Sequence, residues 1–170
     1  MIITITGASG VGKTFTTKAL AKTIFNNKKV KVFHFDDMEL PNWEELEDVK
    51  KWQEDATLAW IDKLVTTAQT EDVHIIFEGS TEIKFYQQGF EKHNYTDFKI
   101  CLFDCSQATM KARLIQRGQP ELYHENMIGW LNYLRKEAIE RDVEIIETDK
   151  LTIEEIGQRI MQCLHIGNKS

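Results

Sequence analysis

Eight residues near the amino terminus combine glycines, a lysine and a hydroxyl group in a spacing that suits phosphate binding. The segment Gly7–Thr14 reads GASGVGKT and fits the pattern G-x-x-x-x-G-K-[ST] at every required position. A β-branched apolar run, residues 2–6, precedes it, and a helical pattern follows from Phe15 onward. Strand, loop and helix in this order are typical of a phosphate-binding loop, so we predict a nucleoside triphosphate site here.

The residue types assign roles within this loop. Backbone N–H groups between glycines form a nest for phosphate oxygens, and the positive end of the following helix faces the same anion. We expect Lys13 to reach the β- and γ-phosphates of ATP and the Thr14 hydroxyl to bind Mg²⁺. The residues predicted to contact the nucleotide are Gly7, Ala8, Ser9, Gly10, Val11, Gly12, Lys13, Thr14 and Phe15.

Acidic side chains follow the next two apolar runs, where each predicted strand ends. Asp36 and Asp37 close the run over residues 30–35, and Glu78 follows residues 73–77. Phosphoryl transfer to a hydroxyl needs a carboxylate that accepts the hydroxyl proton, and we assign this role to Asp36. We expect Asp37 to assist, to contact the substrate or to bind Mg²⁺, and Glu78 to hold Mg²⁺ through water.

The arginines are distributed unevenly, because all five lie after residue 100. Arg113 and Arg117 are four residues apart, so they share one face of a predicted helix that ends before Gly118. Guanidinium groups on a stem that leads into a flexible break are typical of a lid that closes over phosphates. We therefore predict a lid over residues 113–135, with Arg113 and Arg117 as catalytic groups and Arg135 as a further candidate.

The region predicted to bind the acceptor, residues 38–70, contains no arginine. It offers lysines and tryptophans instead, namely Lys50, Lys51, Lys63, Trp43, Trp52 and Trp60. Since acceptor phosphates are usually held by arginine forks, this composition favours an acceptor with a neutral hydroxyl over a nucleoside monophosphate. The tryptophan spacing is typical of helix packing, although one of these rings could stack on a ligand.

Apolar runs and helical patterns alternate along the whole chain. Strands are predicted at 2–6, 30–35, 73–77, 98–103 and 143–146, and later helices at 49–70, 83–92, 106–117, 126–140 and 153–164. The alternation indicates one α/β domain, residues 1–170, in which helices cover both faces of a five-stranded parallel sheet as a three-layer α/β/α sandwich. Ligands bind beyond the carboxyl ends of such strands, so the loop, Asp36 and Glu78 should meet at one edge. His34 is interpreted as a satisfied sheet residue.

Composition and charge argue against several functional classes. The net charge of −6 disfavours non-specific binding to nucleic acid or to an anionic membrane. No apolar run approaches the length of a membrane span. The cysteines are three, an odd number, which is typical of free thiols in a reducing cytoplasm. We expect a cytoplasmic monomer or homodimer.

Several segments taken together resemble the small P-loop kinases of the nucleoside and nucleotide kinase-like superfamily, which includes shikimate, gluconate, uridine and adenylate kinases. The similarity of order covers nearly the whole chain and rests on GASGVGKT, FHFDD, VHIIFEG, RLIQRG and ETDKLTIEEI. The resemblance implies the sheet order 2-3-1-4-5, Mg-ATP as donor, Asp36 in the place of the hydroxyl-activating carboxylate and Arg117 in the place of a lid arginine. It also implies that residues 148–151 lie near the adenine.

We therefore expect an ATP-dependent kinase that transfers the γ-phosphoryl group of Mg-ATP to a hydroxyl of a nucleoside or small metabolite. One alternative is a P-loop ATPase or nucleotide-dependent switch that acts through a protein partner. The GTPase and ABC versions of that alternative are weakened, because the sequence contains neither N-K-x-D nor L-S-G-G-Q. The other alternative is a nucleoside monophosphate kinase, which the lack of acceptor-side arginines disfavours.

Overall fold

A parallel sheet forms the centre of the computed structural model, which describes residues 1–23, 29–39, 41 and 46–164. The strands are β1 (Ile2–Thr6), β2 (Val30–His34), β3 (His74–Glu78), β4 (Phe98–Asp104) and β5 (Glu144–Glu147). Their order is β2-β3-β1-β4-β5, and every neighbouring pair runs parallel. The predicted α/β class and the strand order 2-3-1-4-5 are confirmed.

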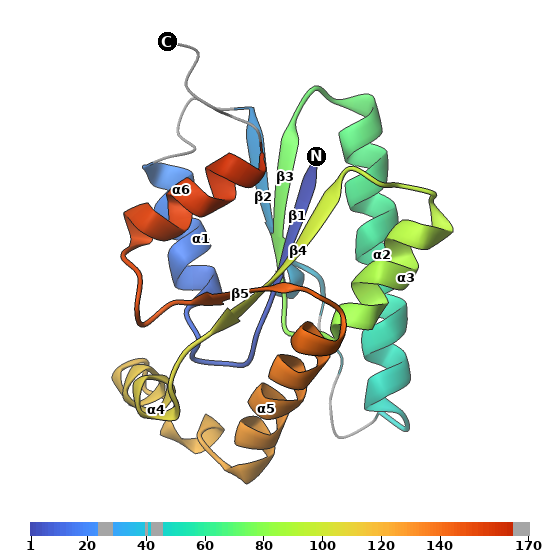
Figure 1. The fold of residues 1–170 in the computed structure, drawn as a ribbon. Helices are drawn as coiled ribbons and strands as arrows, with labels where there is room; N and C mark the ends of the chain where they lie inside the picture. The colour runs from blue at the N-terminus through green and yellow to red at the C-terminus, as the bar shows by residue number, and fades with distance from the viewer. Residues whose placement is uncertain (24–28, 40, 42–45, 165–170) are drawn as a thin grey trace.

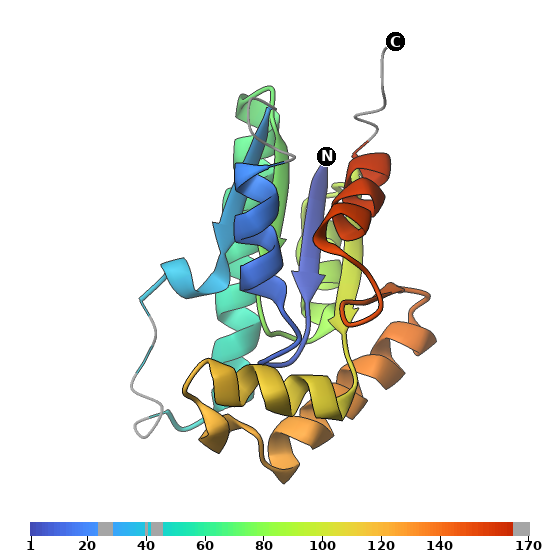
Figure 2. The same cartoon turned by 90° about the vertical axis from the view of Figure 1, so that its left-hand side faces the viewer.

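Helices cover both faces of this sheet (Figure 1). They are α1 (Lys13–Lys22), α2 (Val49–Thr70), α3 (Ile83–Lys92), α4 (Gln107–Gln116), α5 (Glu125–Glu140) and α6 (Ile153–Cys163). Helices α2 and α3 lie on one face and α1 and α6 on the other, whereas α4 and α5 extend beyond the carboxyl ends of the strands (Figures 1 and 2). No helix in the described ranges is long and apolar enough to cross a membrane.

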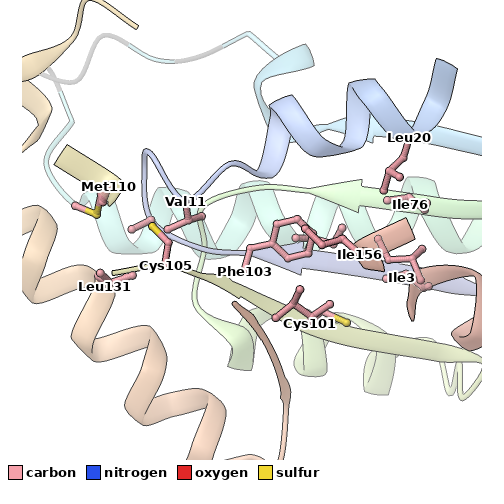
Figure 3. Close-up of a cluster of buried hydrophobic side chains, with 14 of the residues drawn as sticks. Ile3, Val11, Leu20, Ile76, Cys101, Phe103, Cys105, Met110, Leu131 and Ile156 are labelled. Carbon is pink, nitrogen blue, oxygen red and sulfur yellow. The ribbon is translucent and has the colours of Figure 1, made fainter. Parts of the chain in front are cut away.

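Two apolar clusters join the helices to the sheet, because alternate residues of a strand point to opposite faces. On β1, Ile3 packs in the cluster of α1 and α6, whereas Ile2 packs in the cluster of α2 and α3. Figure 3 shows the first cluster, where Val11 of the phosphate loop lies among buried core side chains. The sheet core thus extends into the loop and holds its backbone in place.

One strand is shorter than the sequence predicted. The second strand ends at His34 rather than at Phe35, because Phe35–Asp37 forms the short 3-10 turn η1. The aromatic ring of Phe35 still packs in the core, which explains why the apolar pattern includes it. A second 3-10 turn, η3 (Pro120–Leu122), follows α4 at the predicted break. Trp43, from the predicted acceptor region, lies outside the described residues.

A buried carboxylate on α5 fixes the start of α3. Glu137 is only 4% exposed, and its two oxygens accept hydrogen bonds from the backbone N–H groups of Ile83 (2.8 Å) and Lys84 (2.9 Å). The guanidinium of Arg141 pairs with the same carboxylate at 3.1 Å. Helix α3 has no capping side chain of its own at Glu82, so α5 supplies the partner for its first N–H groups.

We expect Glu137→Ala to lower the free energy of unfolding by about 2–4 kcal/mol, because one buried and one partly buried N–H group lose a charged acceptor. Urea denaturation followed by circular dichroism measures the change. Glu140→Ala, an exposed carboxylate on the same helix, is the matched control and should change stability by no more than about 0.5 kcal/mol. Equal losses for the two variants would show that the contact of Glu137 with the start of α3 does not stabilise the fold.

Candidate nucleotide and acceptor site

The phosphate loop connects β1 to α1 and is anchored by its own apolar residues. Ala8 and Val11 are fully buried, which ties the loop to the core beneath it. Gly12, the residue before α1, has φ 99°, a left-handed conformation that a residue with a Cβ rarely adopts. The loop backbone is therefore held in a bent form with its N–H groups available at the start of the helix.

Lys13 is surrounded by groups that act on its charge. Its Nζ donates to the carbonyl oxygens of Gly7 at 2.7 Å and Ala8 at 3.1 Å. Burial lowers the pKa of Lys13; the carboxylates of Glu78 and Asp36 act to raise it, and Arg117 lowers it further. The structure thus brings four predicted site residues, from four separate segments, into electrostatic range of one another.

A chain of hydrogen bonds links the loop to β3 and β2. The Thr14 hydroxyl donates to Glu78 Oε1 at 2.8 Å, and His34 Nδ1 lies 2.8 Å from the same oxygen. Glu78 is buried and forms the carboxyl end of β3, where it lies in register with His34 of β2. The sequence interpretation of His34 as an ordinary sheet residue did not include this contact. Its position at the end of a strand beside the other acidic ends was the available signal.

The acidic pair after β2 has two different environments. The carboxylate of Asp37 accepts a hydrogen bond from the backbone N–H of His34 at 3.1 Å and so caps η1. Asp36 is exposed and makes no hydrogen bond among those found in the described residues. Phe35 anchors the turn by packing against Trp52 of α2, with ring centroids 6.0 Å apart. The turn therefore leaves Asp36 as the carboxylate that is available to a ligand.

The segment after β3 fits closely against this turn. A Cβ built on Gly79 would lie 2.9 Å from the Cβ of Phe35, an atom that cannot rotate away. Glycine is thus required by the close approach of the two backbones. Because Glu78 precedes this glycine and Asp36 follows Phe35, one tight contact sets the relative position of the two carboxylates.

The arginines predicted to form a lid differ in their contacts. Arg113 donates through Nη1 to the carbonyl of Val11 (2.9 Å) and through Nη2 to the carbonyl of Thr148 (3.1 Å). Thr148 itself donates to the Val11 carbonyl at 2.6 Å, so this segment after β5 lies against the phosphate loop. Arg117, at the end of α4, is exposed and acts on Lys13 through its charge alone.

Arg135, the further candidate, is engaged within the protein. Its Nε donates to Asp104 Oδ2 at 2.7 Å and its Nη2 to the carbonyl of Cys105 at 2.8 Å. The pair ties α5 to the end of β4. We therefore interpret Arg135 as a group that positions α5 beside the phosphate loop.

The tryptophans and lysines of α2 mostly serve packing. Trp60 is buried against Phe77, with ring centroids 5.0 Å apart, and Lys63 Nζ lies 4.5 Å from the centroid of the Trp60 ring. Lys51 pairs with Asp55 at 2.6 Å. Lys50 differs, because among the described residues its ion-pair partner is Glu82, whose Oε1 is 3.7 Å away. The packing interpretation of Trp60 agrees with its position in the core.

The residues around Thr14 fit a magnesium ion. Thr14 and Glu78 present hard oxygen atoms next to the phosphate loop. The described residues contain no group of three or more His, Cys, Asp or Glu side chains able to hold a metal by themselves. Mg²⁺ does not need one, because it usually keeps several waters and binds one or two protein oxygens together with substrate phosphates.

The remaining residues of the predicted nucleotide set lie at the loop surface. Ser9 and Gly10 are half-buried, and Phe15, in the first turn of α1, is 72% exposed. A large apolar ring at this level of exposure can cover a ligand without first leaving a packed position. The assignment of these residues to the nucleotide remains a prediction.

A comparison with protein-family models matches residues 3–145 of the chain to the model described as an AAA domain. A search of curated proteins found no significant match.

Solved structures share the fold over nearly the whole chain. A sugar kinase from Janibacter sp. HTCC2649 aligns with TM-score 0.70 and 15% identity over 98% of this chain and 95% of that one. Shikimate kinase from Acinetobacter baumannii aligns with TM-score 0.63 and 16% identity over 99% and 95%. A gluconokinase from Sinorhizobium meliloti 1021 aligns with TM-score 0.66 and 14% identity over 96% and 91%. At these identities the likeness establishes the fold.

We expect Gly79→Ala to destabilise the protein by about 1–3 kcal/mol, because the added methyl overlaps Phe35 and the backbone must shift. Gly129→Ala, in α5, is the control: a Cβ there meets nothing within 4 Å. In that helix alanine should stabilise by about 0.5–1 kcal/mol. Urea unfolding measures whether each change lowers or raises the free energy of unfolding. An unchanged free energy for Gly79→Ala would refute the tight contact between β3 and η1.

Proposed function

The chain belongs to the AAA-domain family, whose model spans residues 3–145, and from this premise we propose that it is an ATP-dependent kinase acting on a hydroxyl of a small molecule. The observation that supports the proposal best is the grouping of Glu78, Asp36 and Arg117 around the charge of Lys13. A phosphate loop by itself would serve any NTPase. A neighbouring exposed carboxylate that can take a proton is the additional part that transfer to an alcohol requires.

Each of these residues has a defined task in the proposed transfer. The acceptor oxygen attacks the γ-phosphorus and forms a new O–P bond, while the bond between that phosphorus and the bridging oxygen of ADP breaks. Asp36 takes the proton of the acceptor hydroxyl. Lys13 and Arg117 stabilise the negative charge on the transferring group and on the departing ADP oxygen.

Thr14 and Glu78 are the residues that would hold Mg²⁺. When bound, the ion neutralises charge on the β- and γ-phosphate oxygens. The hydrogen bond from Thr14 to Glu78 keeps both oxygens on the same side of the loop. His34 contacts the same Glu78 oxygen as Thr14 does and so helps to orient the carboxylate.

The proposal extends to the surrounding segments. Residues 113–135 contain the end of α4, η3 and the larger part of α5, and we assign them to a lid that brings Arg117 over the phosphates. Residues 38–70 form the acceptor arm. Neighbouring solved structures of this fold are named as kinases of a sugar, of shikimate and of gluconate, which favours a small hydroxylated acceptor here as well.

The cysteines support a cytoplasmic location in this proposal. Cys101, Cys105 and Cys163 are all free. Burial raises the pKa of the Cys101 thiol to about 12 and that of the Cys105 thiol to about 11, so both stay protonated and unreactive at neutral pH. We infer a monomer or homodimer that acts on small molecules without binding nucleic acid.

Asp36→Asn tests the proton acceptor. We expect acceptor-dependent ADP release to fall by about 10²–10⁴-fold, because an amide cannot take the hydroxyl proton. Binding of Mg-ATP, measured by calorimetry, should change little. Asp37→Asn is the matched control and should lose much less activity, since its carboxylate caps η1.

Two outcomes of that experiment contradict the proposal in different ways. Full activity of Asp36→Asn would remove the base assignment and leave the nucleotide site intact. Slow hydrolysis that no small molecule stimulates, but that a protein partner does, would favour a nucleotide-dependent switch.

Glu78→Gln tests the magnesium site. The amide keeps the shape but removes the charge, so the Mg²⁺ concentration for half-maximal turnover should rise by about tenfold or more. Affinity for ATP measured in excess EDTA should not weaken, because the change removes a carboxylate that repels the phosphates. A magnesium requirement equal to that of the wild type would place the ion elsewhere.

A further inference from the structure

An open hollow lies between the first turn of α2, the start of α3 and one face of α5. Its volume is about 310 Å³, at the small end of the range of roughly 300–1,000 Å³ that is usual for small-molecule sites. The residues that line it are Lys50, Glu82, Asn126, Gly129, Trp130 and Tyr133. The polar groups of this lining include a carboxylate, an ammonium and an amide, which are groups of the kinds found in ligand sites.

Glu82 is a buried carboxylate that is only partly engaged. One oxygen, Oε2, accepts from Tyr133 Oη at 2.5 Å and from Lys84 Nζ at 2.6 Å. The other, Oε1, has Lys50 Nζ at 3.7 Å, beyond hydrogen-bond distance. Burial acts to raise the pKa of Glu82, but the bonds from Lys84 and Tyr133 outweigh it and the pKa is lowered. The ionised group thus keeps one oxygen able to accept from a ligand.

The aromatic wall of the hollow has its polar ends already satisfied. Trp130 and Tyr133 stack with ring centroids 5.5 Å apart and planes inclined by 10°. Trp130 Nε1 donates to Ser80 Oγ at 3.1 Å, and the Tyr133 hydroxyl is held by Glu82. The ring surfaces that remain are apolar, so they suit the carbon face of a ligand ring.

The hollow is joined to the reaction site through a short segment. Ser80, which holds Trp130, is two residues beyond Glu78, and its carbonyl accepts from Gln53 Nε2 of α2 at 2.9 Å. Thr81 follows, and its carbonyl accepts from the Thr6 hydroxyl at the end of β1 at 2.6 Å. The hollow therefore adjoins the backbone segment that carries Glu78, the proposed magnesium ligand.

Resting on the kinase function proposed above, we infer that this hollow binds the phosphoryl acceptor, and that the acceptor is an uncharged polyhydroxylated ring. The source of that ring is either a free sugar or the ribose of a nucleoside. Hydroxyl groups donate to the open oxygen of Glu82 and accept from Lys50, whereas the ring carbons lie on Trp130 and Tyr133.

Charge separates this class from phosphorylated acceptors. A phosphate in the hollow would meet the ammonium of Lys50, but it would also face the buried carboxylate of Glu82, whose paired ammonium, on Lys84, is already engaged with the other oxygen. Because a hydroxyl both donates and accepts, it is compatible with both groups at once. No arginine is among the residues that line the hollow, which points the same way.

Gly129 provides a direct test, because it lines the hollow and a Cβ built on it meets nothing within 4 Å. Gly129→Leu fills the hollow with a side chain that favours helix, so the fold should be retained. We expect the Kd for a neutral polyol to rise by about tenfold or more, with unchanged affinity for Mg-ATP. Lys136→Leu, at an exposed position of α5, is the matched control and should leave both affinities unchanged.

The probes are ribose, glucose and adenosine as neutral polyols, with AMP and gluconate as charged comparisons. Calorimetry measures their binding to the full chain, and ADP release measures transfer. Ribose or glucose binding without adenosine binding identifies a free sugar, and the reverse identifies a nucleoside. Glu82→Gln is a second variant, in which the same polyol should bind about tenfold more weakly because a charged hydrogen bond is lost.

The outcomes separate this inference from the proposed function. Binding restricted to AMP or gluconate, binding of no neutral polyol, or polyol binding unaffected by Gly129→Leu would each overturn the inference. Polyol binding that Gly129→Leu weakens, without any transfer from ATP, would leave the hollow established and remove the kinase function. Transfer from ATP to an acceptor whose binding Gly129→Leu does not change would support the kinase function and overturn the hollow as the acceptor site.

Discussion

The placement of one ammonium group organises the functional end of this molecule. Lys13 is half-buried and donates to two carbonyls of its own loop. Burial disfavours its charged form, so the position depends on compensation by nearby anions. Glu78 and Asp36 provide it, although both come from later strands. A nucleotide phosphate would provide the same compensation, which is why a phosphate loop and its acidic neighbours form one electrostatic unit.

The last residue of β3 and the two residues after it connect Lys13 and its neighbours to the rest of the site. Glu78 faces Thr14, Gly79 lies against Phe35, and Ser80 holds the indole of Trp130. Three consecutive residues therefore touch the phosphate loop, the turn that carries Asp36, and the hollow on α5. Because backbone contacts leave little freedom, a change at this segment affects all three parts together.

The contacts of the basic residues divide them into two kinds. Arg113 and Arg135 use their guanidinium groups on carbonyls and carboxylates of the protein, and they fasten α4 and α5 to the loop and to β4. Arg117 and Lys50 have no such close partner among the described residues and remain available to ligands. The first two arginines hold the outer helices in position, and the other two cations can approach a ligand.

The sequence by itself determined the phosphate loop, the helices and strands, and the alternation that leads to a parallel sheet. These features depend on spacing between near neighbours, and the pattern of Gly7–Thr14 or of residues 49–70 contains that information. The sequence also predicted that Asp36 and Glu78 lie at one edge of the sheet, because parallel strands end together. The strand order came from the resemblance to a family and was confirmed by the register of the strands.

Only the tertiary structure decided which side chains meet. The contact of His34 with Glu78 depends on β2 and β3 being paired in register, and the hollow between Lys50 and Trp130 depends on how α2 and α5 pack. Whether Asp37 caps a turn or faces a ligand depends on where β2 ends. Such contacts join residues far apart in the chain, and their geometry is set by packing of whole elements rather than by local spacing.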